Sequence, residues 1–298
     1  MNALRILIWR NTKLFFKDKG MFFTSLVTPL ILLLLFVTFL SNVYRESFSS
    51  LADAWGGSAD ESLMEGFVGG WLFSSLLAVC CVTVAFCSNM LMVQDKVTGA
   101  RMDLTMTPVK NAALSMGYYI AAALSTLLIC MVALVACLIY LGQVGWYLSG
   151  RDILLTCLDV FLLTMFGTSL SSIVNHFLST QGQMSAVGTI VSAGYGFICG
   201  AYMPISQFSD SIQTFISFLP GTYGTALLHS HLLRGVYEEL EQTMPEQAVD
   251  SLREAFDSQL YFFSHRVSEG QMYGVMAAST AALIGLYVLL GRCRARRH

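Results

Sequence analysis

Six long apolar stretches constrain this chain more than any other feature of its sequence. Each is long enough to form a helix of about 20 residues, which is the length that crosses a hydrocarbon core of roughly 30 Å. The stretches are residues 21–40, 67–93, 112–141, 153–173, 184–202 and 272–290. Backbone groups cannot stay unpaired in lipid, so each stretch must cross as a helix. The sequence therefore predicts an all-α, polytopic membrane protein with six transmembrane helices.

The composition indicates a single membrane domain. Of the 298 residues, 55% are hydrophobic and 12% are charged, and the mean hydropathy is +0.63, whereas soluble domains have about 25% charged residues. The sequence has no internal repeat, so we expect one transmembrane domain over residues 21–298, preceded by a short segment of residues 1–20. The first apolar stretch has spanning length and no small-residue cleavage site, so we expect a retained helix rather than a signal peptide.

The distribution of lysine and arginine predicts the orientation. If the N-terminus is cytoplasmic, twelve of the seventeen Lys and Arg residues fall in inner segments, and the outer segments collect most of the carboxylates. The positive-inside rule therefore favours both termini in the cytoplasm. We expect a multi-pass protein of the bacterial plasma membrane. The net charge of −2 conceals this asymmetry, and we expect no nucleic-acid partner.

Residues 1–20 are typical of an amphipathic helix that lies at the membrane interface. Leucine, isoleucine and phenylalanine share one side of a helical wheel, and Arg10, Lys13 and Lys17 share the other side. This segment is either a basic anchor at the lipid surface or a contact for a cytoplasmic partner.

The segment 203–271 is predicted to be an outer re-entrant hairpin with a lid. Residues 204–219 and 222–233 are apolar but too short to cross, and Pro220-Gly221 separates them. The polar residues 237–266 that follow are too few for a core of their own, so we expect them to cover the outer end of the membrane helices. The segment 41–66 between the first two spans is expected to be a plain connector.

Small residues recur at every fourth position in the fifth stretch. Ser192, Gly196 and Gly200 would leave one helix face with almost no side-chain bulk, so another helix could approach closely. The partner helix belongs either to a second copy or to another span of this chain.

Few residues inside the spans could carry chemistry. Asp159 is the one carboxylate well inside a span, and an intramembrane carboxylate indicates either a functional polar site or a structural hydrogen bond to a neighbouring helix. His229 and His231 are two residues apart and point in different directions on a helix, so we expect no metal site there. Seven of the eight cysteines lie within the spans and none lies in an outer loop, which argues against disulfides.

The sequence has no phosphate-binding loop of the Gly-x-x-x-x-Gly-Lys-Ser/Thr type. We therefore expect the chain to bind no cofactor and to have no enzymatic activity of its own. Any ATP and Mg²⁺ would be bound by a partner.

The charged segment 94–110, between the second and third stretches, is similar in pattern to a known family. Asp95-Lys96, Gly99, Leu104 and Thr107-Pro108 resemble the cytoplasmic signature of ABC-2 type transporter permeases. Gly200-x-x-x-Pro204 after the fifth span and Leu219-Pro220-x-x-Tyr223 before the sixth agree with that family. Asp95 stands where the family often has Glu, and Met102 stands where it often has an acidic residue, with Asp103 one position later.

The resemblance implies a coupling helix at residues 94–110 that docks a separate ATP-binding subunit. Lys96, Arg101 and Asp103 would be its exposed contacts, and Thr107-Pro108 would end it. The residues implied in coupling are Asp95, Lys96, Gly99, Arg101, Asp103, Leu104, Thr107 and Pro108. Two ATP-binding subunits and a second permease copy, in a homodimer embedded in lipid, are the implied partners.

The resemblance also implies ATP-driven export by alternating access. The spans are apolar and rich in Phe, Met and Leu, so we expect a hydrophobic or amphipathic cargo such as a drug, antibiotic, peptide or lipid-like compound. The first, second and fifth spans are the expected walls of the pathway. A glycan or sodium exporter of the same family, an ATP-independent scaffold and an intramembrane enzyme remain alternatives.

Overall fold

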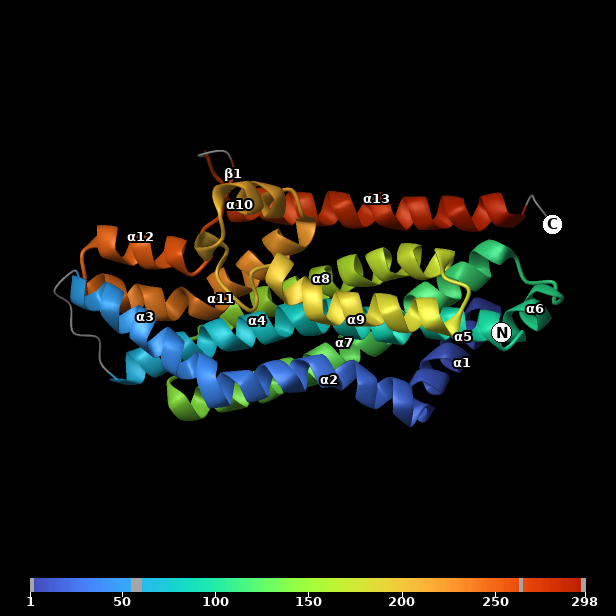
Figure 1. Ribbon diagram of the computed structural model, residues 1–298, viewed down its shortest axis with the longest axis horizontal. Coiled ribbons are helices and arrows are strands. Elements are labelled where there is room, and N and C mark those ends of the chain that lie inside the picture. The colour runs from blue at the N-terminus through green and yellow to red at the C-terminus, as the bar shows by residue number, and fades with distance from the viewer. Residues whose placement is uncertain (1–2, 55–60, 263–264, 296–298) are drawn as a thin grey trace.

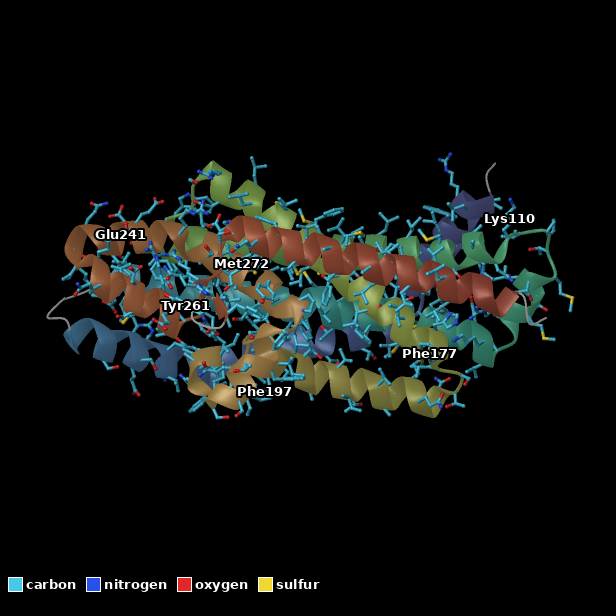
Figure 2. The ribbon with its side chains drawn as sticks, turned by 90° about the horizontal axis from the view of Figure 1, so that it is seen from above. Lys110, Phe177, Phe197, Glu241, Tyr261 and Met272 are labelled. Atoms are coloured by element: carbon cyan, nitrogen blue, oxygen red, sulfur yellow. The ribbon has the colours of Figure 1, made fainter. Side chains whose placement is uncertain are left out.

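The computed structural model describes residues 3–54, 61–262 and 265–295. Figure 1 shows long helices lying side by side along the longest axis, with both marked chain ends at the same end of the bundle. We call this the terminal end and the opposite one the far end. In Figure 2, Lys110 and Phe177 lie at the terminal end and Glu241 lies at the far end.

The described chain is almost entirely helical. The first half contains α1 (Ala3–Lys17), α2 (Lys19–Leu35), the π-helix η1 (Phe36–Leu40), α3 (Ser41–Ala54), α4 (Glu61–Asn89), α5 (Leu91–Val97), α6 (Ala100–Thr105) and α7 (Asn111–Val144). The second half contains α8 (Gly150–Phe177), α9 (Gln181–Ile198), the 3₁₀-helix η2 (Ile205–Gln207), α10 (Asp210–Ser217), α11 (Pro220–Thr243), α12 (Glu246–Ala255) and α13 (Glu269–Ala295). Between α12 and α13, β1 (Tyr261–Phe262) and β2 (His265–Arg266) pair in antiparallel fashion.

Five helical segments are long and apolar enough to cross a membrane. They are Lys19–Ser50, Glu61–Val97, Asn111–Val144, Gly150–Phe177 and Glu269–Gly291. The fifth stretch of the sequence forms α9, an 18-residue helix that begins with Gln181 and Gln183 and is not among the five. The prediction of an all-α, multi-pass membrane protein is therefore confirmed, whereas the sixth crossing stays a prediction.

Helix α4 is the centre of the bundle. It packs against α2, α7, α8, α9 and α11, and nearly every residue from Gly66 to Asn89 is buried. A helix that is apolar on all sides is expected in such a central position. Because its own chain surrounds α4, the second span cannot line a pathway between two copies, and that expectation was wrong.

The first span continues farther than the sequence predicted. Asp18 caps α2 by accepting a hydrogen bond from Met21 N, and the helix passes through Pro29 into η1 and α3. Residues 41–54 are therefore a helix rather than a connector. Tyr44 and Phe48 of α3 pack on α4, where the Tyr44 ring lies 4.2 Å from that of Trp71, and this contact explains the extension.

The first of the two short apolar pieces predicted to form a re-entrant hairpin contains α10, and the second lies within α11. The break at Pro220 is correct, because Pro220 begins α11, a position where its missing N–H costs no hydrogen bond. The second arm does not end near residue 233 but runs to Thr243, and α11 packs against α4, α8 and α13. It is thus part of the core. The predicted lid includes α12, which contacts α3 and α11 at the far end (Figure 1).

The small-residue stripe of α9 is filled by the chain that follows it. The Tyr202 ring folds back over Gly196, where an added Cβ would overlap it, and the Tyr202 hydroxyl donates to Ser192 O at 3.3 Å. Gly200 has a φ of 79° and turns the chain there. The stripe therefore receives the chain's own tyrosine instead of a second helix.

Candidate functional site

The segment predicted as one coupling helix consists of two short helices at the terminal end. Helix α5 ends at Val97 and α6 begins at Ala100. Gly99 lies between them with a φ of 83°, in the left-handed region that side chains other than glycine rarely adopt. Helix α6 ends at Thr105, shortly before Thr107-Pro108, as the proline predicts.

Asp95 is buried at the junction of three helices. Its carboxylate accepts hydrogen bonds from Arg10 Nη1 at 2.7 Å and Arg10 Nη2 at 3.2 Å, and from the Tyr118 hydroxyl at 2.5 Å. This hydrogen-bonded carboxylate raises the pKa of the Arg10 guanidinium. Helices α1, α5 and α7 are therefore tied together through one carboxylate.

Lys96 binds the C-terminus of α8. Its ammonium donates to the carbonyl oxygens of Asn175, His176 and Leu178 at 2.8, 2.8 and 2.7 Å. The last carbonyls of a helix lack intrahelical donors and carry partial negative charge, so a lysine is well suited to this position. The expectation that Lys96 is an exposed docking contact was therefore wrong.

The outward surface of the segment carries large apolar side chains beside polar and charged ones. Met102 is 64% exposed and Met106 is 79% exposed. Asp103, Thr107 and Pro108 are also exposed, while Arg101 is half-buried. Leu104 points inward and packs against a small cluster that includes Leu7 and Leu91. Sequence reasoning singled out the charges here and missed the methionines.

Helix α1 packs on the bundle through a narrow stripe. Leu7, Asn11 and Phe15 are buried, one helical turn apart, and α1 contacts α7 along its length. Lys13 and Lys17 are exposed, as expected for a basic face, but Arg10 turns inward to Asp95. The predicted grouping of the three cations on one face was therefore wrong for Arg10.

A second polar cluster surrounds Asp159 in α8. Its Oδ2 lies 2.5 Å from His231 Nδ1 of α11, and its Oδ1 accepts a hydrogen bond from the Tyr273 hydroxyl of α13 at 2.6 Å. Arg234, one turn after His231, pairs with Asp152 at 3.1 Å and with Glu269 at 3.0 Å. Asp152 is also the N3 residue of the capping box that begins α8. Asp159 thus bonds two neighbouring helices.

The two histidines of α11 face opposite ways, as their spacing predicted. His229 stacks on Trp71 with ring centroids 5.4 Å apart and lies 3.0 Å from the Ser75 hydroxyl, on the α4 side. His231 faces α8 and α13. Among the described residues, no group of three or more His, Cys, Asp and Glu could hold a metal ion.

The cysteines of the bundle are packing residues where the structure describes them. Cys80, Cys81, Cys87, Cys130, Cys137, Cys157 and Cys199 are free thiols, and all but Cys157 are buried. Nothing in this arrangement forms a nucleophilic or redox site. The side chain of Cys293 lies outside the described residues.

The residues that pair in these two clusters lie far apart in the sequence, so no local pattern predicted the pairs. Arg10 and Asp95 are 85 residues apart, and Asp159 and His231 are 72 residues apart. A buried charge needs a partner, so the sequence indicated that Asp159 would have one, but it did not identify which residue.

The comparisons with known proteins agree with the family resemblance that the α5–α6 segment carries. No curated protein matches the chain. The family described as ABC-2 type transporter matches residues 2–233, which include α1, the α5–α6 segment and most of the bundle. The protein therefore belongs to the ABC-2 type transporter family, as a multi-pass permease subunit that works with an ABC ATP-binding subunit.

Proposed function

We propose that the chain is the permease of an ATP-driven exporter that moves a hydrophobic or amphipathic compound out across the bacterial plasma membrane by alternating access. Two copies would form the pathway, each docked to one ATP-binding subunit that holds ATP and Mg²⁺. The observation that carries this proposal is the α5–α6 segment, which has large apolar side chains on its outer surface and buried charged links to the long helices.

The outer surface of α5–α6 is suited to a protein partner. Val97, Met102 and Met106 are 47%, 64% and 79% exposed, and Asp103 beside them is exposed as well. Exposed apolar side chains that cluster together mark interaction sites, and methionine adapts its shape to a partner. We therefore assign the docking contact to these three residues and to the exposed Asp103.

The inner surface of α5–α6 is suited to transmit movement. Asp95 links the segment to α1 and α7, and Lys96 links it to α8. A rigid connection lets the partner's movement tilt the long helices as a body. Shifting a two-state equilibrium from 1:99 to 99:1 needs about 5.5 kcal/mol of differential binding, which nucleotide-dependent docking can supply.

The apolar outer faces of α2 and α9 support a pathway between two copies. Phe23, Leu30 and Leu34 of α2 and Ile190 of α9 are all more than half exposed. These faces are uncharged, which favours an apolar cargo over an ionic one. In this arrangement α9 would complete the sixth crossing and both termini would be cytoplasmic.

The alternatives fit the Asp159 cluster less well. A sodium exporter would use Asp159 to bind the ion, but both of its oxygens already lie within hydrogen-bond distance of His231 or Tyr273. A glycan exporter, a scaffold and an intramembrane enzyme have no specific observation in their favour.

The test compares two substitutions at the most exposed docking residue. The permease is reconstituted with its ATP-binding subunit, and co-purification and cargo-stimulated ATPase activity are measured. Met106→Asp is expected to weaken docking at least about tenfold, equivalent to about 1.4 kcal/mol, because it places a charge in an apolar contact. Met106→Leu keeps the apolar surface and is expected to retain activity. Unchanged docking in Met106→Asp, or cargo movement by the permease alone, would contradict the proposal.

A further inference from the structure

Six side chains connect α8, α11 and α13 near the start of α13, the helix whose Met272 is labelled in Figure 2. The members are Asp152 and Asp159 of α8, His231 and Arg234 of α11, and Glu269 and Tyr273 of α13. None of them takes part in the docking segment, and the proposed pathway does not use them.

The cluster leads from the interior of the bundle to a pocket. The side chains of Asp159 and His231 are fully buried, whereas that of Glu269 is 47% exposed. Glu269 also lines a pocket of about 500 Å³ together with Ser230, Arg266 and Ser268. His231 lies between the two carboxylates, so a proton that enters from the pocket reaches the buried carboxylate through one imidazole ring.

The contacts of His231 favour a proton on both of its ring nitrogens. Nδ1 lies 2.5 Å from Asp159 Oδ2. An ionised carboxylate only accepts hydrogen bonds, so with Asp159 ionised Nδ1 is the donor. Nε2 faces Glu269 Oε2 at 3.7 Å and has no closer partner among the described residues. A neutral ring would turn a lone pair toward this second carboxylate, whereas an imidazolium turns an N–H toward it.

The charges around the ring also favour the imidazolium. Asp159 and Glu269 lie against the ring, and Tyr273 stacks beside it. The surrounding network adds Arg234, which pairs with Asp152 and Glu269, and Cys157, which lies near Asp159. Three carboxylates thus meet one permanent cation. Because buried charge without a partner is costly, a bound proton compensates the excess of negative charge.

We propose that Asp159, His231 and Glu269 form a proton-binding site that is loaded from the Glu269 pocket and holds α13 against α8 and α11. Protonated His231 bridges Asp159 and Glu269, and loss of the proton leaves the carboxylates to repel one another and loosens α13. As a regulatory site this rests on the proposed transport function: pH on the pocket side would set how readily α13 moves. Proton binding itself needs no transport.

The first test measures stability without the ATP-binding subunit. The free energy of unfolding of the purified permease is followed between about pH 5 and 8, the range in which histidine is the usual switch. His231→Gln is compared with the unaltered protein, so that the titration of every other group, His229 included, cancels. The slope of stability against pH counts the difference in bound protons between the folded and unfolded states. The contribution of His231 should be present at low pH and lost as pH rises, so His231→Gln should lack about one proton of the slope that the unaltered protein shows.

Equal slopes in His231→Gln and the unaltered protein would overturn the proposal. If His231→Gln does not fold, Glu269→Gln replaces it, because that side chain is half exposed. Removing its charge weakens the hold on the imidazolium, so the proton should be lost at a lower pH than in the unaltered protein. An unchanged titration in Glu269→Gln would also overturn the proposal.

The second test addresses the side from which the proton enters. The permease and its ATP-binding subunit are reconstituted in vesicles, and the pH is varied on one side at a time. Transport should respond to the pH on the side of the Glu269 pocket, and this response should be absent in His231→Gln and present in His229→Gln. A response only to the opposite side would overturn the entry route. Lack of any transport would count against the proposed function, while the stability test would still decide proton binding.

Discussion

Arg10 of α1 and Asp95 of α5 form a two-armed ion pair, with the guanidinium nitrogens 2.7 and 3.2 Å from the carboxylate oxygens. The Asp95 side chain is almost fully buried and that of Arg10 is about one-third exposed. Such a pair fixes the angle between the guanidinium and the carboxylate, because both hydrogen bonds must form at the same time. We therefore expect helix α1 and the α5–α6 segment, which we propose as the docking segment, to move as one unit.

Replacing Arg10 should destabilise the permease more than removing both charges. Arg10→Met leaves Asp95 buried without its cation, and we expect a loss of about 1–3 kcal/mol, reduced from the fully buried case because Arg10 is partly exposed. The double variant Arg10→Met with Asp95→Asn should recover part of this loss. Unfolding of Arg10→Met, Asp95→Asn and the double variant in detergent gives the interaction free energy as a double-mutant cycle. Additive effects would argue that the ion pair is not a structural link.

Replacing Lys96 should loosen the end of α8. Lys96→Met removes the donor to three backbone carbonyls, and we expect a loss of about 1–2 kcal/mol together with faster amide hydrogen exchange near Phe177. Lys96→Arg keeps a charged donor and is the matched control. If Lys96→Met exchanged as slowly as the unaltered protein, the cap would be dispensable.

The far end of the molecule should become less stable as pH rises. Asp257 accepts a hydrogen bond from Ile205 N at 2.6 Å, and burial raises the pKa of its carboxyl from 3.8 to about 7. The folded state therefore binds more protons than the unfolded state between these values, so the free energy of unfolding falls as pH rises through this window. Asp257→Asn keeps an acceptor and cannot ionise.

Asp257→Asn should therefore lose the part of the pH slope that lies between about pH 4 and 7. Unfolding of the purified permease at several pH values provides the measurement. His231→Gln retains Asp257, so the contribution of Asp257 cancels when the slope of that variant is compared with the slope of the unaltered protein. A slope unchanged by Asp257→Asn would show that this carboxyl does not titrate in that window.

Helix α9 should tolerate alanine at Gly194 but not at Gly196. Gly196→Ala places a methyl group against the Tyr202 ring, whereas a Cβ at Gly194 meets nothing within 4 Å. We expect a loss of about 1–3 kcal/mol for Gly196→Ala and a gain of up to about 1 kcal/mol for Gly194→Ala, since alanine favours the helix. Native mass spectrometry should find the same oligomer in both variants, because Tyr202 of the same chain fills the stripe. A changed oligomer only in Gly196→Ala would show that a second copy packs there.

Much of the fold follows from local features of the sequence. Apolar length fixed the long helices, and Pro220 marked the start of α11. The pattern from Asp95 to Pro108 identified the segment at the terminal end. These features act through residues close together in the chain, so they can be recognised without knowing how the helices pack. The same reasoning failed for residues 41–54, where contact of Tyr44 with Trp71 extends the helix.

The sequence by itself determined that this protein is a helical membrane permease with both chain ends on one side of the bundle and no phosphate-binding loop of its own. Only the tertiary structure decided that Lys96 caps α8, that Arg10 meets Asp95 and that His231 lies beside Asp159. The reason is physical. Burial in lipid depends on the apolar character of each segment alone, whereas a buried charge takes the partner that helix packing brings within reach, and that partner lies tens of residues away in the chain.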